Sequence, residues 1–225
     1  MRRIENEQNI MGGGYTKTLY KKILSKKYIH STRDEHTKHL LESIDLKAIN
    51  TGCPTMWKLT PEHCAKIPTK KAKAVILTLT DSSVNLKLDQ QLINLLINNY
   101  SEVYFWPQGL RDMEYFSSMQ NIECVHVVSP DIFSYDRLLN SVDSIDYIRT
   151  RLHAGIFAMQ HKKRTFILTV DNRASDISKT YNINVFERSN MYGLREAIES
   201  DFQTKVEINL DNIIAWKQQF LIKEN

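Results

Sequence analysis

The feature that most constrains this chain is an alternation, from about residue 73 onward, between short runs of β-branched or apolar residues and segments with helical spacing. Such alternation is typical of repeated β-α units, which build a mainly parallel sheet. It predicts six strands, at residues 74–79, 103–106, 124–128, 144–148, 165–170 and 184–187. We therefore expect an α/β fold with an open, mainly parallel sheet and helices on both of its faces.

Helical patterns separate the predicted strands. Leu88, Leu92, Leu95 and Leu96 recur at the spacing of one helix face. Further helical patterns cover residues 113–119, 136–139 and 153–160. A last helix is expected at residues 211–222, polar on one side and apolar on the other, and we expect it to cross back to a neighbouring domain.

The first 65 residues differ from the rest of the chain. They predict a basic helix, a short strand at residues 28–31, a helix at 34–43 and an extended piece at 48–50. The segment from Lys66 to Lys73, with Pro68 inside it, is the best candidate for a linker. We therefore predict an amino-terminal region at residues 1–65, a remnant of an inter-domain region, and a ligand-binding domain with a C-terminal helix at residues 66–225.

Composition narrows the class of protein. The 225 residues are 42% hydrophobic and 25% charged, and no apolar run approaches the roughly 20 residues of a membrane span. The amino terminus is polar and does not resemble a secretory signal, so we expect a cytoplasmic protein. Cys53, Cys64 and Cys124 match neither a disulfide framework nor a zinc site, and we expect buried free thiols.

The net charge of +4 is concentrated in two lysine clusters, at residues 17–27 and 66–73. The first cluster lies on a predicted amphipathic helix with Leu19, Ile23 and Leu24 on its other side. No aromatic platform or recognised motif accompanies the lysines, so we expect no nucleic-acid partner. Solvated helix faces explain both clusters, and a peripheral contact with an anionic membrane surface remains open.

Ligands of open parallel sheets bind beyond the carboxyl ends of the strands, so the residues that follow each predicted strand are the candidates. In the loop after the fourth strand, Arg151 and His153 stand where a helix begins. A guanidinium, an imidazole and the free N–H groups of a helix start suit a phosphorylated or carboxylated ligand. The alternative is that His153 caps or packs against the helix while Arg151 makes a surface ion pair.

Other candidates are less specific. Gln108 and Asp112, in the loop after the second strand, could bind sugar hydroxyls or merely shape a turn, and Arg173 follows the fifth strand. Arg33 follows the amino-terminal strand, where it could bind an anion or form an ion-paired helix start with its acidic neighbours. His36 and His39 share a helix without ligand partners at recognisable spacing, so we predict no metal site.

Three segments together resemble a known family: residues 31–35 (Ser-Thr-Arg-Asp-Glu), 50–57 (Asn-Thr-Gly-Cys-Pro-Thr-Met-Trp) and 151–154 (Arg-Leu-His-Ala). In order and separation they are similar to polysaccharide pyruvyl transferases, over residues 11–185. The resemblance implies two Rossmann-like halves of a GT-B-like architecture, with this chain similar to the carboxy-terminal half. It implies a transferase of cell-surface polysaccharide (exopolysaccharide) biosynthesis that moves pyruvate from phosphoenolpyruvate to two sugar hydroxyls as a ketal, without a cofactor.

By the same resemblance, Arg33 and the run Arg151-Leu152-His153 contact phosphoenolpyruvate, with His153 as general acid/base and the two arginines as clamps. The expected partners are phosphoenolpyruvate and a saccharide or lipid-linked oligosaccharide acceptor. By the same resemblance, we expect that the family's amino-terminal domain is missing from this sequence. The resemblance implies that the chain is a fragment, a shortened paralogue or one subunit of a split enzyme. A separate amino-terminal domain or a homo-oligomer would then complete it.

Two other functions remain open at this point. A GT-B-type glycosyltransferase that uses a nucleotide sugar would place a nucleotide at the same strand ends. A non-catalytic truncated paralogue or partner subunit would retain the anion pocket without turnover.

Overall fold

The computed structural model describes residues 14–80, 83–149, 151–169 and 180–221, which form two compact units. Unit 1 combines the chain up to Trp57 with the residues from Ile208 onward, and unit 2 spans residues 58–207. Residues 66–73 therefore lie within unit 2. The domain boundary predicted at residue 65 stays a prediction, because compactness alone does not define a domain.

Unit 2 is built on one parallel six-stranded sheet. Its strands are β3 (Ala74–Leu77), β4 (Glu102–Phe105), β5 (Val125–Val127), β6 (Ile145–Arg149), β7 (Thr165–Thr169) and β8 (Val185–Glu187). The order across the sheet is β5-β4-β3-β6-β7-β8, and every neighbouring pair is parallel. Numbered along the chain this is 3-2-1-4-5-6, the order of a Rossmann fold. All six predicted strands and the predicted fold class are confirmed.

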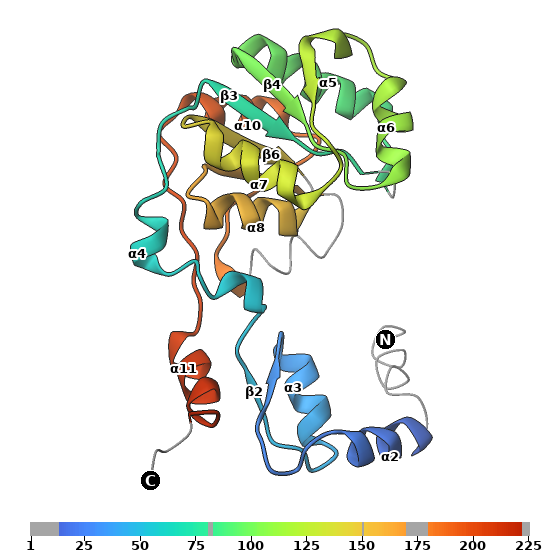
Figure 1. The fold of residues 1–225 in the computed structure, drawn as a ribbon, viewed down its shortest axis with the longest axis vertical. Helices are drawn as coiled ribbons and strands as arrows, with labels where there is room; N and C mark the ends of the chain where they lie inside the picture. The colour runs from blue at the N-terminus through green and yellow to red at the C-terminus, as the bar shows by residue number, and fades with distance from the viewer. Residues whose placement is uncertain (1–13, 81–82, 150, 170–179, 222–225) are drawn as a thin grey trace. The chain divides into compact units, whose positions relative to one another are not determined.

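Helices cover both faces of this sheet (Figure 1). Alternate side chains of β3 point to opposite faces. Val75 and Leu77 join a core with α5 (Leu86–Asn99), α6 (Leu110–Ser117) and α10 (Met191–Glu199). Ala74 and Ile76 join a second core with α7 (Ile132–Ser141) and α8 (Leu152–Gln160). The two cores make unit 2 a three-layered α/β structure.

Two helices of unit 2, α10 and the short α4 (Pro61–Cys64), were not predicted from the sequence. The α10 segment is amphipathic, with Leu194 and Ile198 buried at i, i+4 spacing. Its amino terminus is well defined, because Asn190 accepts the Gly193 N–H at 2.9 Å. Unit 2 also includes the 3-10 turn η3 (Ile122–Cys124).

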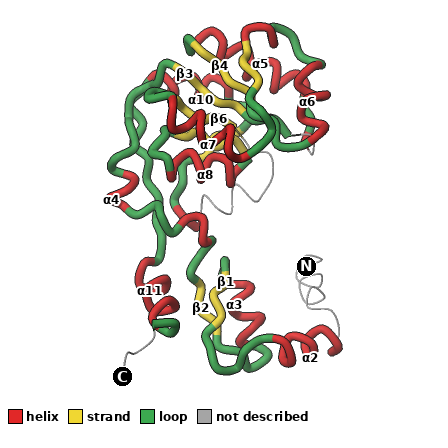
Figure 2. Tube along the Cα trace, in the orientation of Figure 1, coloured by secondary structure: helices red, strands yellow, loops and turns green. Residues whose placement is uncertain are grey.

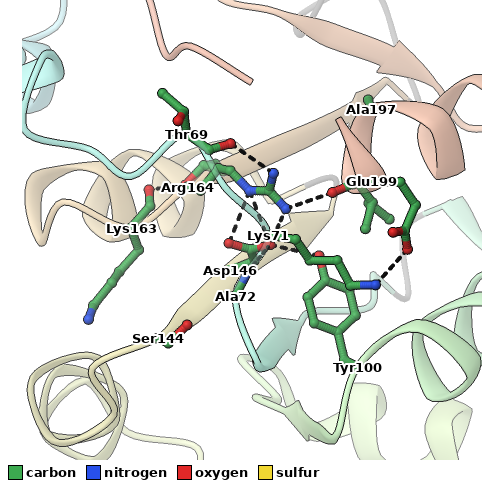
Figure 3. Close-up of polar contacts among 12 residues, drawn as sticks. Thr69, Lys71, Ala72, Tyr100, Ser144, Asp146, Lys163, Arg164, Ala197 and Glu199 are labelled. Atoms are coloured by element: carbon green, nitrogen blue, oxygen red, sulfur yellow. Dashed lines mark hydrogen bonds and ion pairs between the residues drawn. The ribbon is translucent and has the colours of Figure 1, made fainter. Parts of the chain in front are cut away.

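A buried ion pair ties the amino-terminal edge of the sheet together (Figure 3). Arg164, directly before β7, pairs with Asp146 of β6, with Nη2 2.7 Å from Oδ2. Its guanidinium also donates to the carbonyls of Thr69, Ile198 and Ser200. Asp146 accepts the Tyr100 hydroxyl at 2.7 Å. Because every side-chain group in this cluster is buried and hydrogen-bonded, it stabilises the edge opposite the strand ends where ligands bind.

Unit 1 contains a small β-α-β motif, in which β1 (His30–Thr32) and β2 (Ala48–Asn50) pair in parallel beside α3 (Glu35–Glu42) (Figure 2). The Asp34 side chain caps α3 by accepting the Thr37 N–H at 2.7 Å. Also in unit 1 are α2 (Gly14–Ile23), the 3-10 turn η1 (Pro54–Met56) and α11 (Leu210–Gln218).

The last helix, α11, belongs to unit 1. Asn212 donates its side-chain amide to the Asn50 carbonyl at 2.9 Å. Trp216 donates its indole N–H to the Ile29 carbonyl, also at 2.9 Å. Side-chain hydrogen bonds to the backbone of β2 and of the residue before β1 thus fix the helix on this motif.

The cysteines are free thiols, as expected, but they are not all buried. Cys64 is buried and Cys53 is partly exposed, whereas Cys124 is exposed at the end of η3. The expectation of burial was wrong for Cys124 because the turn lies on the surface before β5. Across the part of the chain that the structure describes, no helix is both long enough and apolar enough to cross a membrane.

Candidate anion-binding site

The candidate site lies at the carboxyl edge of the unit 2 sheet, where the strand order reverses between β3 and β6. In open α/β sheets this reversal opens a crevice in which ligands bind. Arg151 connects the two strand ends across it, because its Nε donates to the Leu79 carbonyl at 3.1 Å. Arg151, which was a candidate because it follows a predicted strand, therefore lies where the strand order reverses.

Arg151 is held in place by a buried carboxylate. Its Nη2 lies 2.8 and 2.9 Å from the two side-chain oxygens of Asp112. Asp112 is fully buried and also accepts the backbone N–H groups of Gln108 and Gly109, each at 2.9 Å. A buried carboxylate with these donors in place has no exposed oxygen for a sugar hydroxyl. The structure gives Asp112 the turn-shaping role that the sequence left open, with the orientation of Arg151 in addition.

The backbone of Arg151 is fixed as well. The Tyr147 hydroxyl, from β6, donates to the Arg151 carbonyl at 3.0 Å and lies 2.9 Å from the Thr78 hydroxyl. Arg151 occupies the N-cap position of α8 and makes no side-chain capping bond there. The helix α8 thus begins at the carboxyl edge of the sheet, and a helix amino terminus in this position favours an anion.

The structure brings most of the predicted site residues to this edge. Leu152 and His153 are the first two residues of α8, and the His153 side chain is exposed. Gln108 is partly buried in the loop that Asp112 organises. Arg173 lies outside the described residues. Leu152 can contribute only its N–H, because its side chain is apolar.

Arg33 lies in unit 1 directly after β1, and its side chain is exposed. The parallel pairing of β1 with β2 aligns Thr32 with Asn50, so two of the family-like segments meet at the carboxyl end of this small sheet. The Thr51 N–H donates to the Thr32 carbonyl at 3.1 Å. Gly52 follows with a φ of 70°, a conformation that favours glycine.

The acidic residues next to Arg33 have other partners. Asp34 caps α3, while Glu35 accepts hydrogen bonds from Asn50 and Lys38. Hydrogen bonding to Asn50 is the largest influence that lowers the pKa of Glu35. Within the described residues no carboxylate lies at ion-pair distance from Arg33. Its positive charge is therefore exposed and not engaged by its acidic neighbours.

Sequence reasoning missed a second arginine–carboxylate pair at the carboxyl edge of the unit 2 sheet. Arg188, directly after β8, places Nη2 2.5 Å from Oδ2 of Asp89 and donates from Nη1 to the Ser83 carbonyl at 2.7 Å. The Tyr115 hydroxyl donates to the same carboxylate at 2.6 Å. The strand-end rule would have found Arg188 had it been applied to the last strand. Asp89 was visible as an acid on the apolar face of the helix with Leu92 and Leu96.

The chain is similar to one known protein family. A family model described as polysaccharide pyruvyl transferase matches residues 10–172. This chain belongs to the polysaccharide pyruvyl transferase family. The matched range includes Arg33 and the run Arg151-Leu152-His153, and it ends before Arg173 and β8.

Neither the comparison with curated proteins nor that with solved structures gives a match. Family membership therefore rests on the matched range, while the strand order is an independent observation about the fold. In the described part of this pyruvyl transferase family member, no three side chains of His, Cys, Asp or Glu gather closely enough to hold a metal ion.

Proposed function

We propose that this chain supplies the donor-binding part of a polysaccharide pyruvyl transferase and binds phosphoenolpyruvate at the amino terminus of α8. The observation that carries the proposal is the position of Arg151 at the start of α8, at the point where the strand order reverses. Helix amino termini favour phosphate and carboxylate groups, and phosphoenolpyruvate carries both.

In this proposal Arg151 and the start of α8 contribute differently to binding of the donor anion. Asp112 occupies one edge of the Arg151 guanidinium and balances much of its charge. The amino terminus of α8 is therefore the proposed main contact of the donor anion, with Arg151 as a fixed neighbour. Arg33 remains the second proposed cationic contact, on the strength of its motif and its exposed charge.

The proposed reaction forms a ketal at C2 of phosphoenolpyruvate. The methylene carbon takes up a proton and becomes the methyl group, two acceptor hydroxyl oxygens bond to C2, and the bond to the phosphate oxygen breaks. One hydroxyl proton balances the proton that the methylene gains, and the other leaves with phosphate. His153 is the proposed general acid/base, because it is exposed on the first turn of α8 and histidine is the side chain that most often performs this role.

The acceptor is proposed to be a saccharide or lipid-linked oligosaccharide, and the cell compartment is proposed to be the cytoplasm. The exposed position of His153 leaves room for a large acceptor. The second wall of the acceptor site is assigned to a separate amino-terminal domain or a second copy of the chain.

A thermal-shift titration tests donor binding. A ligand that binds only the folded state at 100 times its Kd adds about 2.7 kcal/mol of stability. Phosphoenolpyruvate is expected to raise the Tm of the wild-type chain and of Arg111→Ala, an exposed control on the first turn of α6. The Tm rise is expected to shrink in Arg33→Ala. No shift in the wild-type chain, or a shift with a nucleoside diphosphate alone, would reject the proposed donor.

The catalytic role is tested separately by phosphate release in the presence of a saccharide acceptor. His153→Ala is expected to retain the phosphoenolpyruvate shift and to lose turnover about 100-fold or more, the usual contribution of a general acid/base. Full activity in His153→Ala would remove that residue from the mechanism. Binding without turnover in every wild-type preparation would instead support a non-catalytic member of the family.

A further inference from the structure

The apolar side of the helix α2 is not fully buried. Leu24, just beyond the helix, packs against Ile44 and Leu46. Leu19 and Ile23 instead remain 42% and 63% exposed. These two residues stand four apart and therefore lie on the same side of the helix. A pair of exposed aliphatic side chains on a short basic helix calls for an explanation.

An aromatic pair continues the exposed apolar region beyond α2. Tyr28 stacks on Phe220, with ring centroids 5.7 Å apart, and both rings are substantially exposed. Phe220 also packs edge-on against Trp216, with centroids 5.0 Å apart. Each ring is held by its neighbours while it presents an open side to solvent. The chain turn that carries Tyr28 begins only two residues after Ile23, at Ser25, whose hydroxyl accepts the Tyr28 N–H.

The charge of this region is uniformly positive. Residues 14–29 include five lysines and no acidic residue. Among the described residues only Lys21 of these five has a carboxylate at ion-pair distance, that of Asp45 at 2.8 Å. The Lys27 ammonium lies 5.3 Å from the centre of the Tyr28 ring, so charge and aromatic surface are interleaved. Lys22 and Lys26 are exposed beside Ile23.

We propose that this basic-apolar surface, made by Lys22, Ile23, Lys26, Lys27, Tyr28 and Phe220, binds the anionic phospholipid surface of a membrane. The proposal is independent of the transferase activity. Lysines next to aliphatic and aromatic side chains are the combination by which peripheral helices rest in the headgroup layer. The lysines attract the negative headgroups, and the apolar side chains enter the acyl boundary between them.

Charge complementarity favours a lipid surface over a nucleic acid. The exposed aliphatic residues Leu19 and Ile23 would gain nothing from a phosphate backbone, whereas burial in the acyl boundary removes their apolar area from water.

Vesicle co-sedimentation tests the proposal on the full chain. Vesicles of phosphatidylcholine with added phosphatidylglycerol are expected to bind it, and vesicles of phosphatidylcholine alone are not. Each lysine near an anionic surface strengthens binding about fivefold, so Lys22→Gln/Lys26→Gln/Lys27→Gln is expected to weaken it about 100-fold. Ile23→Ser/Phe220→Ser is expected to weaken binding while preserving its salt dependence, because it removes apolar contacts alone.

The matched control is Lys66→Gln/Lys70→Gln/Lys73→Gln, which removes the same charge from three exposed lysines of unit 2. This control is expected to change binding by less than about threefold. Equal losses in the two triple variants would overturn the assignment of the surface, since net charge alone would explain them. Absence of wild-type binding to the anionic vesicles, or tighter binding to a double-stranded oligonucleotide than to those vesicles, would overturn the lipid assignment.

Discussion

One nitrogen of the Arg151 guanidinium lies within hydrogen-bond distance of both oxygens of Asp112, a carboxylate 39 residues earlier in the chain and fully buried. This pair joins the start of α6 to the start of α8 across the carboxyl edge of the sheet. It means that a change at Arg151 alters the structure of the site as well as its charge. Any experiment on donor binding has to separate these two effects.

Removal of Arg151 is expected to destabilise the fold. Arg151→Ala leaves Asp112 buried without its cation, and the free energy of unfolding is expected to fall by about 3 kcal/mol. The exposed Arg111 on the first turn of α6 is the matched control, and Arg111→Ala should change stability by less than about 0.5 kcal/mol. Urea unfolding followed by circular dichroism measures both. Equal stabilities would show that the pair does not support the fold.

Gly155 permits α8 to approach the sheet closely. A Cβ at this position would lie 3.1 Å from Tyr147 and 3.2 Å from Thr165. Gly155→Ala is therefore expected to lower stability by about 1–2 kcal/mol, since overpacking outweighs the gain in helix propensity. Gly14, at the start of α2, has no atom within 4 Å of such a Cβ, so Gly14→Ala should be neutral or slightly stabilising. Thermal unfolding of the two variants tests this difference, and an unchanged Tm for Gly155→Ala would contradict it.

Loss of the buried pair of Arg164 and Asp146 should lower the free energy of unfolding more than loss of an exposed pair beside it. Arg164→Met leaves the Asp146 carboxylate uncompensated and is expected to cost about 4 kcal/mol. Lys71, which pairs with the exposed Glu199, is the control drawn in the same view (Figure 3), and Lys71→Met should cost less than about 1 kcal/mol.

The double variant Arg164→Met/Asp146→Asn separates charge from packing in this cluster. It removes the unpaired charge and should therefore be more stable than Arg164→Met alone. Chemical denaturation of the three variants at one pH gives the comparison. A double variant no more stable than Arg164→Met would show that the loss comes from packing and from the carbonyls that Arg164 satisfies.

Thiol reactivity should distinguish the cysteines. Burial raises the pKa of the Cys64 thiol, so at pH 8 a smaller fraction of this thiol than of an ordinary cysteine is in the reactive thiolate form. The rate at which Cys64 is modified should therefore increase as the pH rises. Cys124 is exposed. A chromogenic disulfide reagent is expected to modify Cys64 at least about tenfold more slowly than Cys124 in the native state, and at a similar rate in urea. Mass spectrometry identifies the modified site, and rapid native labelling of Cys64 would contradict its burial.

Local sequence patterns predicted most of the architecture because secondary structure repeats at short range. The six strands of unit 2 were visible as apolar runs, and parallel pairing brings their carboxyl ends to one edge. That rule led to Arg151 and His153 without any structure. The family-like segments around Arg33 and Asn50 were also visible, since each is continuous in the chain.

The partners of the charged side chains could only be decided by the tertiary structure. Arg188 and Asp89 are 99 residues apart, and their pairing depends on how β8 and α5 lie across the sheet. From the sequence, Asp112 could bind a sugar hydroxyl or shape a turn, and only the structure showed that its carboxylate is buried. Leu19 and Ile23 lie on the apolar side of an amphipathic helix and yet remain exposed, whereas Leu24 packs against the small core of unit 1.

The sequence by itself therefore determined which segments become strands and most of the helices, which strand ends are candidates for a site, and which family the motifs resemble. These properties follow from the period of apolar residues and from contiguous motifs, both of which are local. The tertiary structure decided the strand order 3-2-1-4-5-6, the buried carboxylate behind Arg151 and the exposure of the basic-apolar surface. Those properties depend on which distant segments pack together, because burial and ion pairing are set by neighbours in space rather than neighbours in sequence.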